Sequence, residues 1–217
     1  MTGNSASTLN QLENTLNDFD GNKRCEALRE LARLVQSGQI EVSQPKPEVN
    51  LHLHTFFSYN AYGWSPSRIA WESKKYGLAV AGIVDFDVVD GMEEFLQAGQ
   101  IIDVRTTVAL ETRVLIPEYG DKVISSPNEP GVGYFMAGGC FGQPTDDKSA
   151  KALDDLRETA KRRNLQVLER VNDYLGSVTL DYNADVLPLT PSGNATERHL
   201  LAAYDARARA VCGDKTD

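Results

Sequence analysis

The chain has 217 residues, of which 41% are hydrophobic and 24% are charged, as expected for a soluble globular protein with one sizeable core or two small ones. Its formal net charge of -9 argues against a dedicated binder of nucleic acid or of an anionic membrane surface. Only 3 histidines are present, namely His52, His54 and His199. A histidine-rich metal centre must therefore be built from these side chains.

The cysteines and the N-terminus bear on the cellular compartment. Cys25, Cys140 and Cys212 are far apart and odd in number, which argues against a disulfide framework or a zinc knuckle. The N-terminus has neither the basic segment nor the apolar stretch of a secretory signal. The longest apolar run, residues 77–84, is too short to span a bilayer. We therefore expect a cytoplasmic protein with no membrane partner.

Residues 1–44 are predicted to form a helical N-terminal extension. Leucines recur at helical spacing in residues 9–16 and again in residues 28–34. The proline-containing segment 43–48 then indicates a linker. Residues 45–217 are predicted to form a separate unit of alternating strands and helices.

The first predicted strand covers residues 49–54, where polar and apolar residues alternate. This alternation places Asn50, His52 and His54 on one face and the apolar side chains on the other. Ser65 and Pro66 then form a good helix start. The helix is expected to stop at Gly77, before a continuously apolar strand over residues 78–84.

A second helix and a third strand complete the repeat. Asp90 with Glu93 resembles a capping box, so we expect a helix from Asp90 to Gly99. Residues 106–114 are predicted to form the third strand. Strands that alternate with helices predict an α/β protein with a parallel sheet.

The regular pattern ends after residue 116. Residues 117–146 are rich in glycine, proline, asparagine and aspartate and are expected to form a long insertion. Helices are predicted over residues 146–175 and 196–210, and residues 176–193 are left unassigned. The inward-facing residues expected on the first of these helices are Leu153, Leu156, Leu165, Leu168 and Val171.

The strongest local signal for chemistry is the pair His52 and His54. On a strand this spacing puts both imidazoles on one side, where they can hold a single metal ion. They also lie at the C-terminal end of the first strand, which is where β/α proteins form their active sites. The alternative is that both are polar residues on a solvated strand face.

Acidic residues follow or occupy the next two strands. Asp85 and Asp87 end the second strand, and the alternative to metal binding is capping of the following helix or a turn by Asp87. Capping is favoured for at least one of the two aspartates. Glu111 lies in the third strand, where a buried carboxylate needs a partner. That partner is either a metal ion or Arg113, two residues further on the same face. Together the three strands bring nitrogen and oxygen ligands to one rim, which suits zinc, manganese or iron.

These segments resemble part of a known family. Residues 50–55 (Asn-Leu-His-Leu-His-Thr), 82–91 and 109–111 are similar to the N-terminal motifs of the PHP (polymerase and histidinol phosphatase) family. The family pattern is Asp-x-His-x-His-Thr, then Thr-Asp-His-Asp, then a strand ending in glutamate. The resemblance covers about residues 49–116 and extends loosely to residues 196–199.

The resemblance implies a fold, an activity and a set of site residues. Members form distorted β/α barrels that hold two or three metal ions, and many hydrolyse phosphate esters with metal-activated water. Carried over by position, His52, His54 and Glu111 are metal ligands. Asp85 orients the site from behind these ligands. We therefore expect residues 45–217 to be the N-terminal portion of such a barrel, with an insertion at about residues 117–193.

The resemblance also places two residues of the last helix near the substrate. Arg198 and His199 are expected to meet a substrate phosphate, because a guanidinium suits bidentate phosphate binding. The alternative is that both belong to a solvated first turn of that helix. The expected partner is a phosphorylated small molecule or a nucleotide.

Several positions depart from the family pattern. Asn50 replaces the usual aspartate, and Phe86 replaces the ligand histidine of the second motif. Residues 58–60 (Ser-Tyr-Asn) replace Ser-Asp-Gly, and no later His-Pro or Asp-x-His motif is present. A complete polynuclear site therefore cannot be assembled within these residues.

These departures leave three hypotheses for the function. The leading one is a PHP-type metal-dependent phosphoesterase, present as the N-terminal part of a longer protein. The second is a degenerate, non-catalytic module, in which unpaired barrel edges would favour self-association. The third is a metal-dependent amidohydrolase, which shares the His-x-His motif on a first barrel strand.

Overall fold

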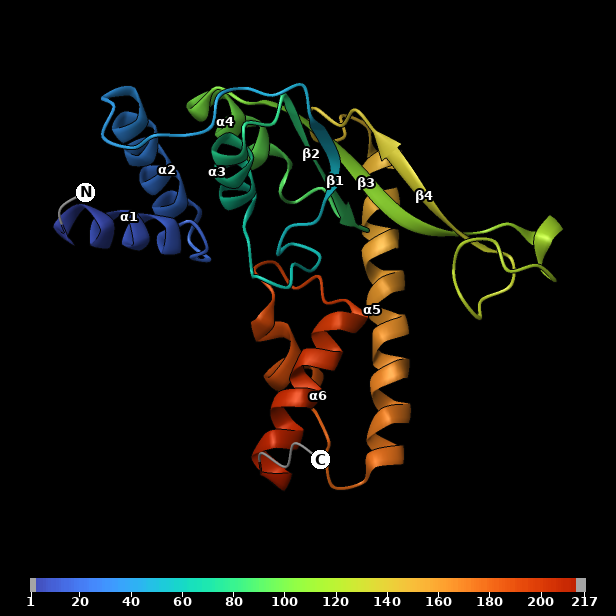
Figure 1. Ribbon diagram of the computed structural model, residues 1–217. Coiled ribbons are helices and arrows are strands. Elements are labelled where there is room, and N and C mark those ends of the chain that lie inside the picture. Colours follow the sequence, from blue (N-terminus) through green and yellow to red (C-terminus); the bar gives the residue numbers. More distant parts are fainter. Residues whose placement is uncertain (1–2, 214–217) are drawn as a thin grey trace.

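The computed structural model describes residues 3–213 and is built around one four-stranded sheet (Figure 1). The strands follow chain order across the sheet, with three parallel strands and an antiparallel fourth. They are β1 (Val49–Leu53), β2 (Val80–Phe86), β3 (Arg105–Leu115) and β4 (Val132–Gly138). The predicted α/β class and the parallel pairing of the first three strands are confirmed.

Helices cover one face of this sheet in two layers. They are α1 (Gly3–Thr15), α2 (Gly21–Gln36), α3 (Pro66–Tyr76) and α4 (Met92–Ile102). Figure 1 shows α3 and α4 against the sheet, with α1 and α2 on their far side. Trp71 and Phe95 are fully buried between the layers, and Ile83 and Val108 contribute from the sheet. This cluster supplies most of the hydrophobic stabilisation of the sheet.

The two N-terminal helices are anchored to that core by partly buried polar contacts. Glu13 of α1 accepts a hydrogen bond from Trp71 Nε1 at 2.7 Å. Arg24 of α2 is 4% exposed and donates through Nε to Glu94 of α4 at 2.8 Å. The sequence predicted the helices of the extension correctly, and the structure places them in one core with the sheet.

Helix α3 begins and ends where the sequence predicted. The Ser65 hydroxyl accepts a hydrogen bond from the Arg68 backbone N–H, and Pro66 occupies the first turn. Gly77 ends the helix at a φ of 82°. A Cβ at Gly77 would lie 2.4 Å from the Gln44 carbonyl oxygen, so both its conformation and its contact require glycine.

The predicted limits of the next helix were wrong. The N-cap of α4 is Gly91, with no side-chain cap, because the Asp90 carboxylate instead accepts hydrogen bonds from Arg157 and Ser192. Gly99 lies inside α4, where a Cβ would come within 2.6 Å of Thr106. This glycine allows the helix to approach β3 closely and does not end the helix.

The segment between β3 and the next long helix contains a strand that the sequence did not reveal. Residues 117–146 were expected to be an insertion without strands, yet β4 pairs with β3 over residues 109–115. A short 3-10 helix, η1 (Pro117–Tyr119), lies in the connection. Because β4 is rich in glycine and lacks alternation, only its pairing with β3 identifies it.

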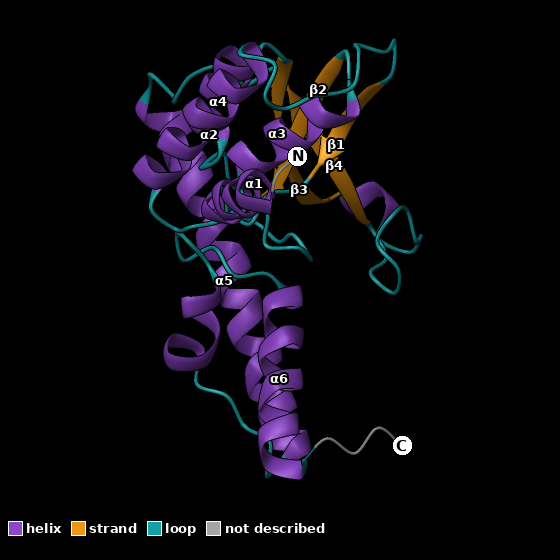
Figure 2. Cartoon of the chain, turned by 60° about the vertical axis from the view of Figure 1, so that its left-hand side comes forward, coloured by secondary structure: helices purple, strands orange, loops and turns teal. Residues whose placement is uncertain are grey.

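Two helices form a second hydrophobic unit; in Figure 1 the longer one starts beside the sheet and runs down to the other, which lies below the sheet in both Figures 1 and 2. They are α5 (Asp147–Leu175) and α6 (Glu197–Cys212), joined through η2 (Tyr182–Val186) and η3 (Leu187–Leu189). Leu168 and Leu200 belong to their shared core, whereas Leu165 is exposed, so its predicted inward position was wrong. Asn164 takes the buried position beside it and donates to the Ala195 carbonyl.

The loop before α6 ties this helical unit to the sheet. Asn194 donates through its side-chain amide to the carbonyl oxygens of Phe57 and Phe86, at 3.1 and 3.0 Å. These carbonyls follow β1 and end β2, so the loop fixes the rim where the polar residues gather. Within residues 3–213, no helix is long and apolar enough to cross a membrane.

Candidate metal centre

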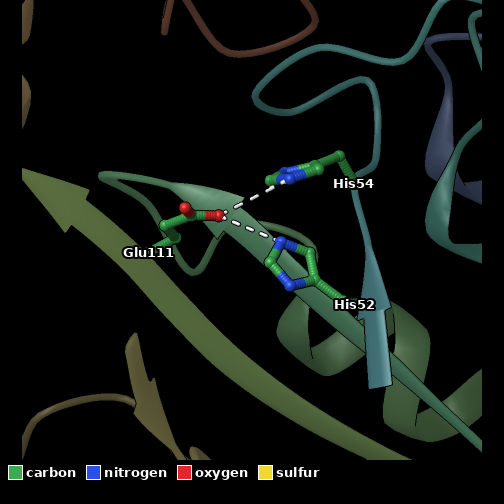
Figure 3. A group of neighbouring side chains, drawn as sticks. All are labelled: His52, His54 and Glu111. Carbon is green, nitrogen blue, oxygen red and sulfur yellow. Dashed lines mark hydrogen bonds and ion pairs between the residues drawn. The ribbon is translucent and has the colours of Figure 1, made fainter. Parts of the chain in front are cut away.

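Both neighbouring histidines lie at the C-terminal end of β1. A bulge interrupts the strand, because the pairing with β2 shifts between Asn50 and Leu53. Asn50 and Leu53 line a cavity beside α3, whereas His52 and His54 point toward Glu111 (Figure 3). The Asn50 side-chain oxygen accepts a hydrogen bond from the His52 backbone N–H at 3.1 Å, and the shift in pairing departs from the simple alternation that the sequence predicted.

Glu111 faces the same point from β3. Its backbone is in register with Phe86 of β2, and its side chain is buried. Arg113, the alternative partner considered for this carboxylate, forms an ion pair with Glu197 at 2.9 Å instead. Among the described residues, the ion-pair partners of Glu111 are the two histidines.

The three side chains converge on a small volume. The Glu111 Oε2 atom lies 3.2 Å from His52 Nε2 and 3.6 Å from His54 Nε2. One ligand atom from each residue lies within 4.8 Å of the other two. Figure 3 shows both imidazoles directed at the same carboxylate oxygen. The two histidines and the glutamate that the sequence indicated are thus brought together.

These distances suit a tetrahedrally coordinated metal ion. Two ligand atoms at about 2.1 Å from such an ion lie about 3.4 Å apart. The two separations from Glu111 Oε2, 3.2 and 3.6 Å, lie on either side of that value. Two imidazole nitrogens with one carboxylate oxygen are a donor set used by zinc, manganese and iron.

The protonation state of His54 also favours metal binding. Burial, with smaller contributions from the charges of His52 and Arg198, lowers the pKa of His54 to about 4. The ring is then neutral near pH 7 and has a lone pair to offer. Its buried Nδ1 atom has no hydrogen-bond partner among the described residues. Strong metal sites normally anchor that second nitrogen, so the structure favours modest affinity.

Phe86 closes one side of the centre. Its ring stacks on the His54 imidazole, with 4.5 Å between centroids and 16° between planes. A phenyl ring offers no ligand atom, so this side of His54 is shielded without adding a donor. The departure noted in the second sequence motif therefore limits the described protein donors to His52, His54 and Glu111.

Asp85 lies behind the centre and does not reach it. The Thr55 hydroxyl and backbone N–H and the Ser58 hydroxyl all donate to its carboxylate, at 2.6 to 2.7 Å. Burial raises the pKa of Asp85 to about 6, although these hydrogen bonds act in the opposite direction. Because Thr55 directly follows His54, Asp85 holds the backbone that carries the second histidine. Asp87 accepts from Thr112 and neither aspartate caps α4, so the capping alternative was wrong, whereas Asp87 does form a turn after β2, at a φ of 62°.

The two candidate residues in the first turn of α6, His199 and Arg198, have different environments. His199 is buried, and its Nδ1 accepts a hydrogen bond from the Thr196 backbone N–H at 3.1 Å in a capping box. Tyr59 packs edge-on against its ring. Arg198 is exposed, and its charge acts on His54. His199 is thus occupied by the helix cap, whereas Arg198 lines a cavity that Phe86 also lines.

The sequence did not single out the cavity next to this centre. Its wall combines Phe86 with Arg113 of β3, Tyr134 of β4 and Arg163 of α5. Arg113 had been considered only as a partner for Glu111. Arg163 was one of many charged residues on a long helix, and Tyr134 lay in the segment expected to lack strands. No local pattern joins these residues, because distant elements bring them together.

Comparison with known proteins supports the fold. No family model and no curated protein matches this sequence. A solved structure from Bifidobacterium adolescentis, assigned as a metal-dependent phosphoesterase, is 19% identical with a TM-score of 0.59, over 81% of this chain and 58% of that chain. An amidohydrolase from Chromobacterium violaceum, solved with sulfate and no metal, is 15% identical with a TM-score of 0.54, over 76% and 50%.

At these identities the likeness shows the fold alone. The chain spans about half the length of the two solved structures, with 58% and 50% of them covered. The four-stranded sheet and its helices correspond to part of a β/α barrel, so the predicted partial barrel is confirmed.

Proposed function

We propose that the chain is the metal-binding part of a PHP-type phosphoesterase, which hydrolyses a phosphate ester with the help of one divalent metal ion. One observation carries the proposal: His52, His54 and Glu111 direct ligand atoms to one point at the C-terminal rim of a partial β/α barrel. The metal-dependent phosphoesterase among the structural neighbours supports it at the level of fold.

The site residues have separable tasks. His52 and His54 offer their Nε2 atoms, and the Glu111 carboxylate offers negative charge that a cation neutralises. Arg198 is exposed and its charge acts on His54, and its guanidinium can bind the oxygens of a phosphate. Asp85 keeps the segment after His54 in place through Thr55. These groups bind and orient the ester and the ion.

The proposed reaction is a simple hydrolysis. A divalent ion held at this centre polarises a phosphoryl oxygen and lowers the pKa of water. The oxygen of water forms a bond to phosphorus, the bond from phosphorus to the ester oxygen breaks, and the alcohol leaves with a proton. The positive guanidinium of Arg198 favours the negative charge that develops on the phosphoryl oxygens.

The test begins with the chain stripped of metal by a chelator. Zinc, manganese or ferrous ions are added, and hydrolysis of 4-nitrophenyl phosphate and bis(4-nitrophenyl) phosphate is followed. We expect activity to rise with metal and to saturate near one ion per chain. The double variant His52→Ala, His54→Ala should lose this activity, whereas Leu51→Ala, an exposed neighbour on β1, should keep it. Equal activity in the double variant would refute the proposal.

A second candidate is a module that binds a metal ion without catalysis. The stack of Phe86 on His54 favours it, because it replaces a donor with a ring and leaves three protein ligands. The same titration distinguishes the two candidates. Metal binding that depends on both histidines, with no hydrolysis of either ester at saturation, would establish the module and exclude the enzyme.

A further inference from the structure

A second cavity opens beside the metal centre and shares one wall with it. Its volume is about 390 Å³, within the range of small-molecule sites. Phe86 is the common wall, since it stacks on His54 and also lines the cavity. The other walls come from β3, β4, α5 and the first turn of α6. A ligand at the metal centre can therefore extend over Phe86 into this space.

Positive charge dominates the lining. The arginines are Arg113, Arg163 and Arg198, and the acidic residues are Glu197 and Asp87. Burial opposes ionisation of Glu197, but its backbone hydrogen bond and the Arg163 and Arg113 charges outweigh burial and lower its pKa. With both acids ionised, the lining still has one positive charge in excess.

The unused hydrogen-bonding capacity lies with Arg163 and Arg198, because Arg113 also donates through Nε and Nη2 to the Tyr134 hydroxyl, at 3.3 and 3.2 Å. The Glu197 Oε1 atom accepts one bond from Arg113 Nη1 and one from Arg163 Nε, both at 2.9 Å. A guanidinium has five N–H donors. Among the described residues, neither terminal amino group of Arg163 has a hydrogen-bond partner, and the Arg198 side chain has none at all. Donors of this kind bind carboxylate or phosphate oxygens in pairs.

The opposite part of the lining is apolar and aromatic. The Phe86 and Tyr134 rings lie 6.3 Å apart, centroid to centroid. The remaining apolar lining residues are Ala160, Ala195 and Leu201. The cavity thus suits a molecule with an apolar body and an anionic end. An inorganic anion alone would leave the apolar part of the lining without a contact.

We propose that this arginine cavity, lined by Arg113, Arg163 and Tyr134, binds a second anionic group of the substrate. This group is a phosphate or a carboxylate on the alcohol from which the metal centre removes a phosphate. That the bound molecule is the substrate rests on the proposed function. Binding of an anion in the cavity does not require the metal ion. The proposed substrate is thus a phosphate ester with two anionic ends.

The first experiment measures binding without metal. The metal-free chain is titrated with phenylphosphonate and with benzoate, and with benzyl alcohol as an uncharged probe. We expect at least one anion to bind and the alcohol not to bind. The Arg163→Gln variant should weaken anion binding about tenfold, the effect of losing a charge-assisted hydrogen bond. A preference for phosphonate or for benzoate identifies which of the two anionic groups the cavity takes.

Two controls make this result specific. Arg162→Gln alters an exposed arginine one position away on α5 and should leave anion binding unchanged. The double variant His52→Ala, His54→Ala should also bind the anion, although it cannot hold the metal. Failure of both anions to bind, or equal binding by wild type and Arg163→Gln, would overturn the proposal. If the phosphoesterase proposal fails, the metal titration described above will show no metal-dependent hydrolysis, whatever the result of anion binding.

The second experiment links the cavity to turnover. Metal-loaded protein is given benzyl phosphate and 4-carboxybenzyl phosphate, and the two kcat/KM values are compared. We expect the carboxylated ester to be preferred, and Arg163→Gln to reduce the ratio of the two values about tenfold. The ratio should be unchanged in Arg162→Gln. An unchanged ratio in Arg163→Gln would show that the cavity does not receive the substrate.

Discussion

Charged side chains are neutralised in different ways on the two faces of the sheet. On the helix-covered face, Arg24 is enclosed by Glu94, by the Asp18 carbonyl and by the ring of Phe56. On the open face, Glu111 meets the imidazoles of His52 and His54, whose side chains are 51% and 24% exposed. The covered face is complete without a ligand, whereas the open face gathers donors that a cation would satisfy. The difference indicates which face maintains the fold and which face binds.

The largest effect is expected on the covered face. Arg24→Ala removes the buried member of this ion pair and leaves the partly buried Glu94 carboxylate without its cation, which should cost about 3 to 5 kcal/mol of unfolding free energy. Urea unfolding of the metal-free protein measures this loss. Arg29→Ala, an exposed residue of the same helix, should change stability by less than about 0.5 kcal/mol. Similar losses in both variants would break the contrast between the faces.

Asp85, at the end of β2, provides a second test of how the protein treats a buried charge. Its pKa is raised from 3.8 to about 6, mainly by burial, so its protonated form stabilises the fold at low pH and this contribution is lost as pH rises through about 6. Asp85→Asn does not titrate. Relative to wild type, the variant should therefore gain about 2 to 3 kcal/mol of stability between about pH 4 and about pH 7. Denaturant unfolding of metal-free protein at each pH measures it, and a pH-independent difference would contradict it.

His199 should act in the opposite direction on the α6 side. Burial lowers its pKa from 6.5 to about 4, so its contribution to stability is present above pH 6.5 and is lost as pH falls through about 4. His199→Gln keeps a side chain that can complete the capping box at this position but does not titrate. On acidification from about pH 7 to about pH 4, the variant should lose about 2 to 3 kcal/mol less than wild type. Parallel pH profiles would contradict this prediction.

The smallest effect concerns Phe86 on the open face. A histidine at this position would stand beside His54 and in register with Glu111, where it adds a donor. Phe86→His should therefore tighten zinc binding about tenfold. Phe86→Leu removes the stack without adding a donor and is the matched control. No gain of Phe86→His over Phe86→Leu in a competition titration would show that Phe86 does not limit the ligand set.

The sequence predicted most of the covered face because local signals define it. Period-two and helical spacings identified the first three strands and their helices, and Ser65 and Gly77 marked one helix at both ends. Strand β4 escaped prediction, because only its pairing with β3 distinguishes it from a loop. The bulge after Asn50 was also missed, since strand pairing creates it and the alternating sequence hides it.

The site residues could be predicted from the sequence where the pattern that indicates them lies within a single strand. The spacing of His52 and His54 on one strand was sufficient to nominate them, and Glu111 followed from its position in a buried strand. The partners of each carboxylate were not predictable. Arg113 pairs with Glu197, which is 84 positions away, and the choice between these partners depends on how α6 docks.

The most direct test of the account is the metal content of the chain, combined with zinc-edge X-ray absorption. Wild-type protein dialysed against limiting zinc should hold one ion per chain, with two imidazole nitrogens and oxygen in its first coordination shell. The double variant His52→Ala, His54→Ala should hold none. Equal zinc content in the two proteins, or a first shell without imidazole, would contradict a metal centre built from His52, His54 and Glu111.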